Sequence, residues 1–140
     1  MIRVRVFNAH PRRKVNIKET VSLVRRVLKN EGTHDAELNI VFINDKRMIE
    51  MNGRYLDHWY TTDVLSFSLT DEGNEKNEGE VYINLDQARR QAKHYNVAIH
   101  NEVSRLVTHG ILHLVGYRDN TRHEKKRMTE REDLYLRHKA

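Results

Sequence analysis

The chain has 140 residues, which suits one domain spanning residues 1–140, and it contains no cysteine. The lack of cysteine excludes disulfides and thiolate metal ligands, so a transition-metal site would have to use His, Asp or Glu. The net charge of +5 favours a polyanionic partner such as nucleic acid, while the lack of a signal-peptide core or a membrane-length apolar run leads us to expect a cytoplasmic protein without a membrane partner.

The first 43 residues predict a strand, a helix and a second strand. Apolar residues alternate with arginine over residues 2–6, as in a half-buried strand near a sheet edge. Residues 16–30 predict a helix in which Asn16 and Glu19 hold capping-box positions, with Gly32 just beyond the end. The apolar residues at helical spacing in this segment are Ile17, Val21, Val24 and Leu28. Residues 38–43 are almost entirely apolar and predict the second strand.

The middle of the chain predicts a helix, two strands and another helix. A helix is expected over residues 45–55, followed by a strand over residues 62–69. Met48, Ile49 and Met51 are expected to face inward from that helix. The polar segment 71–79 predicts a mobile loop, and residues 80–85 predict a strand. Asp86 is expected to cap the next helix, which runs to about Tyr95.

Two further helices are expected at the end of the chain. One covers residues 99–115, and the other covers residues 123–137 with Met128 and Leu134 as its apolar anchors. The order of elements indicates a single mixed sheet of about four strands packed against about five helices.

The long helix carries a pattern typical of a catalytic metal site. His109 and His113 are four residues apart, so both imidazoles can face one cation from the same side of a helix. Gly116 can adopt the left-handed conformation that ends a helix, which would let Asp119 turn back toward the same ion. Three protein ligands leave one coordination position open, as catalytic zinc sites do.

Each part of this pattern has an alternative. The histidine pair can be a packing feature, and Asp119 can instead cap the last helix. His123 is a competing third ligand, ranked behind Asp119. Gly110 occupies the place where zinc proteases of the HExxH type carry their glutamate, which disfavours peptide hydrolysis by that mechanism. Gly110 can serve a close backbone approach, or it can simply be tolerated.

Motifs along the chain resemble those of the YbeY endoribonucleases. The residues that carry this resemblance cover roughly residues 38–130: Asn52, Tyr55, Thr62-Asp-Val-Leu-Ser-Phe67, Gly79-Glu-Val-Tyr-Ile, Asp86, Ala88, Gln91, Ala92, Tyr95, Glu102, Leu106, His109-Gly-Ile-Leu-His113-Leu-Val-Gly116-Tyr117, Glu124 and Met128.

The resemblance implies an α+β fold and a zinc-dependent, single-strand-specific endoribonuclease of the bacterial cytoplasm. It implies that single-stranded RNA, rRNA and the small ribosomal subunit are the partners, with roles in 16S rRNA 3′-end maturation and ribosome quality control. His109 and His113 correspond to metal ligands of the family. The reaction would be the attack of a metal-activated water on a phosphodiester.

Three positions depart from the family pattern. Asp119 stands where the family has a histidine ligand, and Arg118 replaces the usual aspartate. A carboxylate is a good zinc ligand, but its charge weakens the pull on bound water, so nickel or another divalent metal remains an alternative to zinc. Leu56 replaces an arginine that the family associates with activity, and Ser68 replaces a proline that ends the strand.

Further candidates have less specific signals. Glu102 lies two turns before His109 and is the candidate general acid or base, with a structural ion pair as the alternative. Candidate substrate contacts are Arg54, Ser66, Arg89 and Arg90. His58, Trp59 and Tyr60 can stack on unpaired bases or anchor a loop.

Two other functions stay open on the residues alone. One is a noncatalytic ribosome-binding or RNA-binding factor with a structural metal, which Leu56 favours. The other is a metal-dependent hydrolase of another substrate, which the spacing of His109, His113 and Asp119 also permits.

Overall fold

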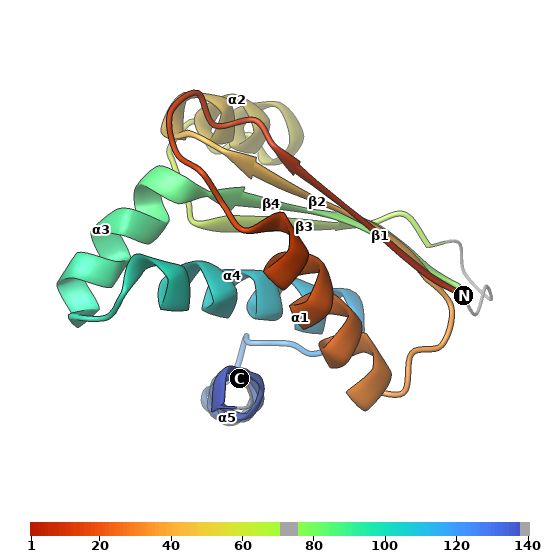
Figure 1. The fold of residues 1–140 in the computed structure, drawn as a ribbon. Coiled ribbons are helices and arrows are strands. Elements are labelled where there is room, and N and C mark those ends of the chain that lie inside the picture. Colours follow the sequence, from red (N-terminus) through yellow and green to blue (C-terminus); the bar gives the residue numbers. More distant parts are fainter. Residues whose placement is uncertain (71–75, 138–140) are drawn as a thin grey trace.

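A four-stranded sheet organises the chain, in the order β1-β2-β4-β3. The computed structural model describes residues 1–70 and 76–137 (Figure 1). The elements in these ranges are β1 (Ile2–Asn8), α1 (Ile17–Asn30), β2 (Ala36–Ile43), α2 (Asp45–Leu56), β3 (Val64–Ser68), β4 (Asn77–Asn84), α3 (Leu85–Tyr95), α4 (Ile99–Leu114) and α5 (Arg122–Arg137). The structure confirms the α+β class and the predicted order of elements.

The sheet is mixed. β1, β2 and β4 run parallel, and β3 pairs antiparallel with β4. β1 lies at a sheet edge, as the alternation of its residues predicted. The prediction of a polar loop over residues 71–79 is wrong for residues 77–79, because Asn77 already pairs with Ala36 of β2. Residues 71–75 lie outside the described residues.

Helices cover both faces of the sheet. Figure 1 shows α2 on one side and α1, α3, α4 and α5 on the other. The larger core lies on the four-helix side, where Ile40 and Phe42 of β2 and Val81 of β4 meet α1 and α4. The smaller core lies under α2, where Met48 and Met51 contact the opposite face of the strands. In β2 and β4, residues that face the larger core alternate with residues that face the smaller core. This is the period-two pattern of strands that are covered on both faces.

Gly110 lets α4 approach the sheet closely. A Cβ atom at this position would lie 2.5 Å from Val81 Cγ1 and 3.2 Å from Ser66 Oγ. The Ser66 hydroxyl also donates a hydrogen bond of 3.1 Å to the Gly110 carbonyl. The glycine therefore serves a close approach between helix and sheet and is not merely tolerated.

Three details of the helices differ from the sequence-based expectations. Ile17 is 46% exposed, because the first turn of α1 extends beyond the core that buries Val24. The anchor expected at Leu134 is wrong, since Tyr135 is 1% exposed and Leu134 is 36% exposed. Asn84, not Asp86, caps α3 by accepting hydrogen bonds from backbone N–H groups of the first turn. Asp86 lies inside that turn, so its carboxylate is directed to other partners.

We predict that Gly110→Ala lowers the free energy of unfolding by about 2 kcal/mol, because overpacking against Val81 outweighs the gain in helix propensity. Denaturant titration measures this loss. In a Val81→Ala background the same change should cost less, since the colliding methyl groups are gone. An equal cost in both backgrounds would contradict the contact.

Candidate metal centre

Three side chains from α4 and the turn after it meet at one point. His109 Nε2 lies 3.1 Å from His113 Nε2 and 3.4 Å from Asp119 Oδ2, and His113 Nε2 lies 3.3 Å from the same carboxylate oxygen. These are the three residues that the sequence singled out. Their ligand atoms form a group that could hold a metal ion.

The size of this triangle suits a small cation. A tetrahedral zinc ion with bonds of roughly 2.0–2.1 Å holds its ligand atoms about 3.3–3.4 Å apart. The three separations of 3.1–3.4 Å fall close to that value, and two imidazoles with one carboxylate form a common catalytic zinc donor set. The residues present therefore fit a divalent transition metal.

The end of α4 turns the chain so that Asp119 reaches the histidines. Gly116 has φ 108°, and its N–H donates to His113 O, while Tyr117 N–H donates to Leu112 O. These are the two hydrogen bonds of a Schellman motif, which needs a residue with positive φ. The left-handed turn predicted at Gly116 is confirmed.

A buried carboxylate fixes the segment that carries Asp119. The Tyr117 hydroxyl donates a 2.6 Å hydrogen bond to Glu31, at the end of α1. Arg131 and the Tyr135 hydroxyl on α5 donate to the same carboxylate. Burial and the Glu31 charge raise the pKa of Tyr135 to about 12, so this hydroxyl stays a donor over the physiological range. The turn is thus tied to α1 and α5 two residues before Asp119.

Glu132 on α5 orients the first histidine. His109 Nδ1 lies 2.8 Å from Glu132 Oε2, and Arg105 contacts the other oxygen of that carboxylate at 3.0 Å. Because a carboxylate only accepts, His109 Nδ1 carries the proton, which leaves Nε2 with a lone pair that a cation bound between His109, His113 and Asp119 could take up. Burial lowers the pKa of His109, but the hydrogen bond and charge of Glu132 outweigh it and leave the pKa raised.

The contact of Glu132 with His109 could not be predicted from spacing along the sequence, because 23 positions separate the two residues. Its only local signal is that it lies on the face of α5 that also buries Met128 and Tyr135. An acidic residue on a buried helix face needs a partner, and this could have been noted from the sequence.

The start of α5 shows where the alternatives for Asp119 and His123 lie. Thr121 Oγ1 accepts from Glu124 N–H at 3.1 Å, and the Glu124 carboxylate accepts from Thr121 N–H at 2.9 Å. Thr121 and Glu124 therefore form the capping box, and Asp119 is free of that role. His123 is exposed on α5 and lies outside the group around His109.

Glu102 lies buried beside α3. It is 3% exposed, and its Oε2 accepts a 2.8 Å hydrogen bond from Gln91 Nε2. Burial raises the pKa of Glu102, although the hydrogen bond from Gln91 and the charge of Arg105 act in the opposite direction. A cavity of about 940 Å³ between α3, α4 and α5 is lined by both Glu102 and His109.

The candidate substrate contacts lie in different places. Ser66 faces α4, and its hydroxyl donates a hydrogen bond to the Gly110 carbonyl, beside the candidate metal centre. Arg54 is exposed on α2, the helix that covers the other face of the sheet. Leu56, at the end of the same helix, is 45% exposed.

Arg89 and Arg90 differ although they are adjacent. Arg90 makes two hydrogen bonds of 2.8 and 2.7 Å to Asp45, which hold the pKa of that carboxyl at about 2. Arg90 therefore ties α3 to α2. Arg89 is exposed and lines a separate cavity beside the segment between β1 and α1.

The three rings of the segment before β3 are largely exposed. Trp59 is 63% and Tyr60 is 58% exposed, and the rings of His58 and Tyr60 stack at 5.3 Å. Trp59 lies so close to Gly53 that a Cβ atom there would be 2.2 Å from its ring. Trp59 anchors this segment on α2 while leaving most of its surface in solvent.

Comparison with known proteins shows the family of the chain. The family model of Endoribonuclease YbeY matches residues 5–140. The chain belongs to the YbeY endoribonuclease family. The expected resemblance is thereby confirmed over more of the chain than the motifs covered, and the enzyme class of the family is nuclease, a hydrolase.

Individual relatives support the assignment. Endoribonuclease YbeY of Salinibacter ruber is 37% identical over 134 residues, covering 91% of this chain and 85% of the relative. The Chlorobium luteolum protein of the same description is 38% identical over 125 residues, covering 89% and 90%. A solution structure from Thermotoga maritima superposes with a TM-score of 0.69 at 25% identity, covering 95% of this chain and 86% of the other.

Among residues 1–70 and 76–137, no helix is both long and apolar enough to cross a membrane.

We predict that Glu132→Gln weakens zinc binding about 10- to 100-fold, because the amide is a poorer acceptor for His109 Nδ1–H than the carboxylate. Competition with a chromophoric chelator measures the affinity. Glu130→Gln, an exposed change on the same helix, is the control and should bind zinc like the wild type. Equal affinities for both variants would exclude the orienting role.

We also predict that Glu102→Gln stabilises the protein at pH 7–8. A carboxyl whose folded pKa is raised contributes stability that is complete below its usual pKa of 4.5 and lost as the pH rises through the folded value. The neutral amide can still accept from Gln91 and avoids this loss, so its advantage should shrink as the pH falls toward 4.5. Unfolding free energies across this range are the measurement. If the variant is less stable at pH 8, the burial argument fails.

Proposed function

We propose that residues 1–140 form a single metal-dependent endoribonuclease domain that cleaves single-stranded RNA, with zinc as its cation. The observation that carries the proposal is the His109, His113 and Asp119 triangle, with edges of 3.1–3.4 Å, in a member of the YbeY family. Nickel or another divalent cation suits the same nitrogen and oxygen donors.

His109, His113 and Asp119 would hold the cation. When bound, such an ion supplies Lewis-acid catalysis: it lowers the pKa of water and stabilises charge that develops on a phosphodiester. The ligand side chains are between 24% and 36% exposed, so substrate can reach the site. Three protein ligands leave a coordination position for the reaction.

Other residues of the chain keep the site in place. Glu132 holds the His109 ring, and Arg105 balances the Glu132 charge. Ser66 and Gly110 fix α4 on the sheet, while Glu31 and Tyr117 fix the turn before Asp119. A site held this rigidly needs little rearrangement during the reaction, which is how preorganised sites gain rate.

Leu56 changes how substrate is held, not the ligand set. It lies on α2, across the sheet from α4, and cannot bind a phosphate. We propose that the chain retains cleavage because the ligand set and its supporting contacts are complete without an arginine there.

For the biological role we propose rRNA processing in the cytoplasm. The substrate would be the 3′ end of precursor 16S rRNA on the small ribosomal subunit, with a further role in ribosome quality control. The support is the family of the chain together with its net charge of +5, which favours binding to RNA.

The test is cleavage of a single-stranded RNA that spans a precursor 16S 3′ end, with zinc supplied. Wild type should cleave it, and His113→Ala should lose at least about 100-fold in rate because a metal ligand is missing. His123→Ala removes an exposed histidine outside the site and should cleave like the wild type. Circular dichroism would show that all three proteins are folded.

Equal cleavage by wild type and His113→Ala would contradict the proposal, because the activity would then not depend on a candidate metal ligand. A double-stranded RNA of the same sequence tests the strand preference and should be cleaved much more slowly.

A further inference from the structure

A second cavity lies on the other side of α4, away from the candidate metal centre. It has a volume of about 770 Å³, within the range of small-ligand sites, and it is enclosed by the segment between β1 and α1 together with α1, α3 and α4. His109, His113 and Asp119 do not line it. From this cavity we propose a second site, one that binds a nucleotide through its phosphate.

A rigid loop presents basic side chains to this cavity. His10 Nδ1 accepts hydrogen bonds from the backbone N–H groups of Arg12 and Arg13, at 3.1 and 3.0 Å. Its other nitrogen, Nε2, must then carry the proton, which it donates to Asp86 at 2.8 Å. Asn8 adds two more hydrogen bonds, to His10 N–H and Arg13 O. The His10 side chain is only 5% exposed, so the loop is held by hydrogen bonds to a buried ring.

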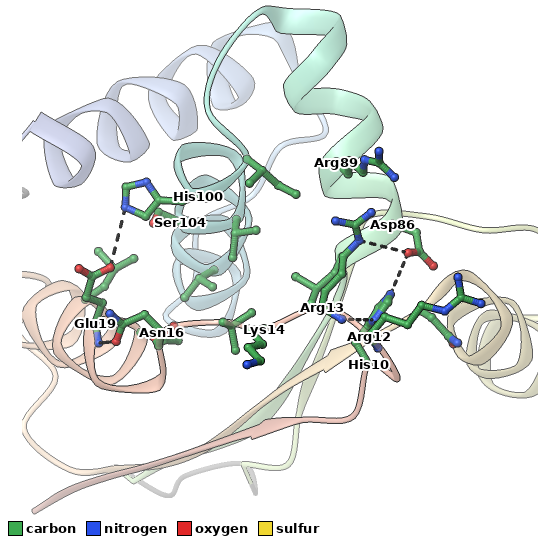
Figure 2. Close-up of a pocket in the computed structure, with 18 of the residues that line it drawn as sticks. His10, Arg12, Arg13, Lys14, Asn16, Glu19, Asp86, Arg89, His100 and Ser104 are labelled. Carbon is green, nitrogen blue, oxygen red and sulfur yellow. Dashed lines mark hydrogen bonds and ion pairs between the residues drawn. The ribbon is translucent and has the colours of Figure 1, made fainter.

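Two acidic residues, Glu19 and Asp86, line the cavity. Asp86 accepts from His10 and lies 3.8 Å from Arg13 Nε, and Glu19 lies 3.8 Å from His100. Figure 2 shows these two groups at opposite ends of the cavity, with Arg89 one turn along α3 from Asp86. The cavity keeps an excess of positive charge, because its lining has five arginine and lysine residues and two carboxylates.

Three cations remain for a ligand. Arg12, Lys14 and Arg89 line the cavity and are exposed, and none forms an ion pair with another residue in the described ranges 1–70 and 76–137. Arginine and lysine side chains are the usual protein partners of phosphate.

Part of the wall is apolar. The side chains that form it come from three helices: Leu23, Leu85, Ile99, Val103 and Val107. A free inorganic anion would leave this surface unused, whereas a nucleotide can place its base and ribose there and its phosphate at Arg89, one of the basic side chains that line the cavity. Combined apolar and charged recognition of this kind is typical of cofactor and nucleotide sites.

Two sources supply such a ligand: a free nucleotide, or an unpaired nucleotide of an RNA strand. The chemistry recognised is the same, and competition distinguishes them. The site does not depend on the metal centre, so its failure would leave the proposed cleavage reaction untouched.

The test is a titration of isotope-labelled protein with uridine 5′-monophosphate, followed by amide chemical shifts. Shifts should concentrate in residues 10–16 and in the first turns of α3 and α4, with or without zinc. Uridine and inorganic phosphate, which each lack one half of the ligand, should bind at least about tenfold more weakly.

Arg89→Ala should weaken the nucleotide about tenfold, because it removes a charge-assisted hydrogen bond. Lys93→Ala, an exposed change one turn further along α3 and outside the cavity, is the matched control and should have less than a twofold effect. Both positions are on the exposed face of a helix, so both variants should fold.

Single-stranded RNA of ten nucleotides, added to chelator-treated protein, identifies the source. Displacement of the mononucleotide assigns the cavity to an RNA strand, and failure to displace it assigns the cavity to a free nucleotide. The proposal is overturned if the shifts map to residues 109–119, if uridine binds as well as its monophosphate, or if Arg89→Ala behaves like Lys93→Ala.

Discussion

The close approach of α4 to the sheet is the constraint on which the rest of the molecule depends. α4 lies between α1, α3 and α5 on one side and β3 and β4 on the other, and at Gly110 its backbone packs directly against Val81 and Ser66 of these strands. His109 and His113 flank this contact along the chain. The residue that fits α4 to the core thus also sets the height of the histidines above the sheet.

Two carboxylates from outside α4 hold residues of the candidate metal centre and of the turn after it in place. Glu132 reaches His109 from α5, and Glu31 reaches Tyr117 from the end of α1. Each is 7% exposed in its side chain and each is balanced by an arginine, Arg105 or Arg131. Buried ion pairs contribute modestly to stability but fix geometry when every partner is satisfied. Here they fix a ring orientation and a turn, the two features that a three-ligand site cannot obtain from helix spacing alone.

The grouping of the candidate ligands was predictable because the signals are local. His109, His113, Gly116 and Asp119 occupy one helix and its end, where spacing and a left-handed turn determine position. Their supporting residues were not predictable in the same way, because Glu132 and Glu31 lie 23 and 86 positions from their partners. Periodicity also failed at two apolar positions. Ile17 is exposed because the first turn of α1 extends past the core, and Leu134 is exposed because its neighbour Tyr135 takes the buried face of α5. Two positive-φ residues other than glycine, Asp57 and Asn96, end α2 and α3 in ways that composition does not reveal.

The central claim is that His109, His113 and Asp119 bind one divalent cation together. X-ray absorption at the zinc edge of the loaded protein measures the ligands directly. The structure predicts one ion per chain with two imidazole nitrogens and a carboxylate oxygen, and Asp119→Ala should lose the carboxylate while keeping both imidazoles. A zinc shell that Asp119→Ala and His113→Ala leave unchanged would contradict the account.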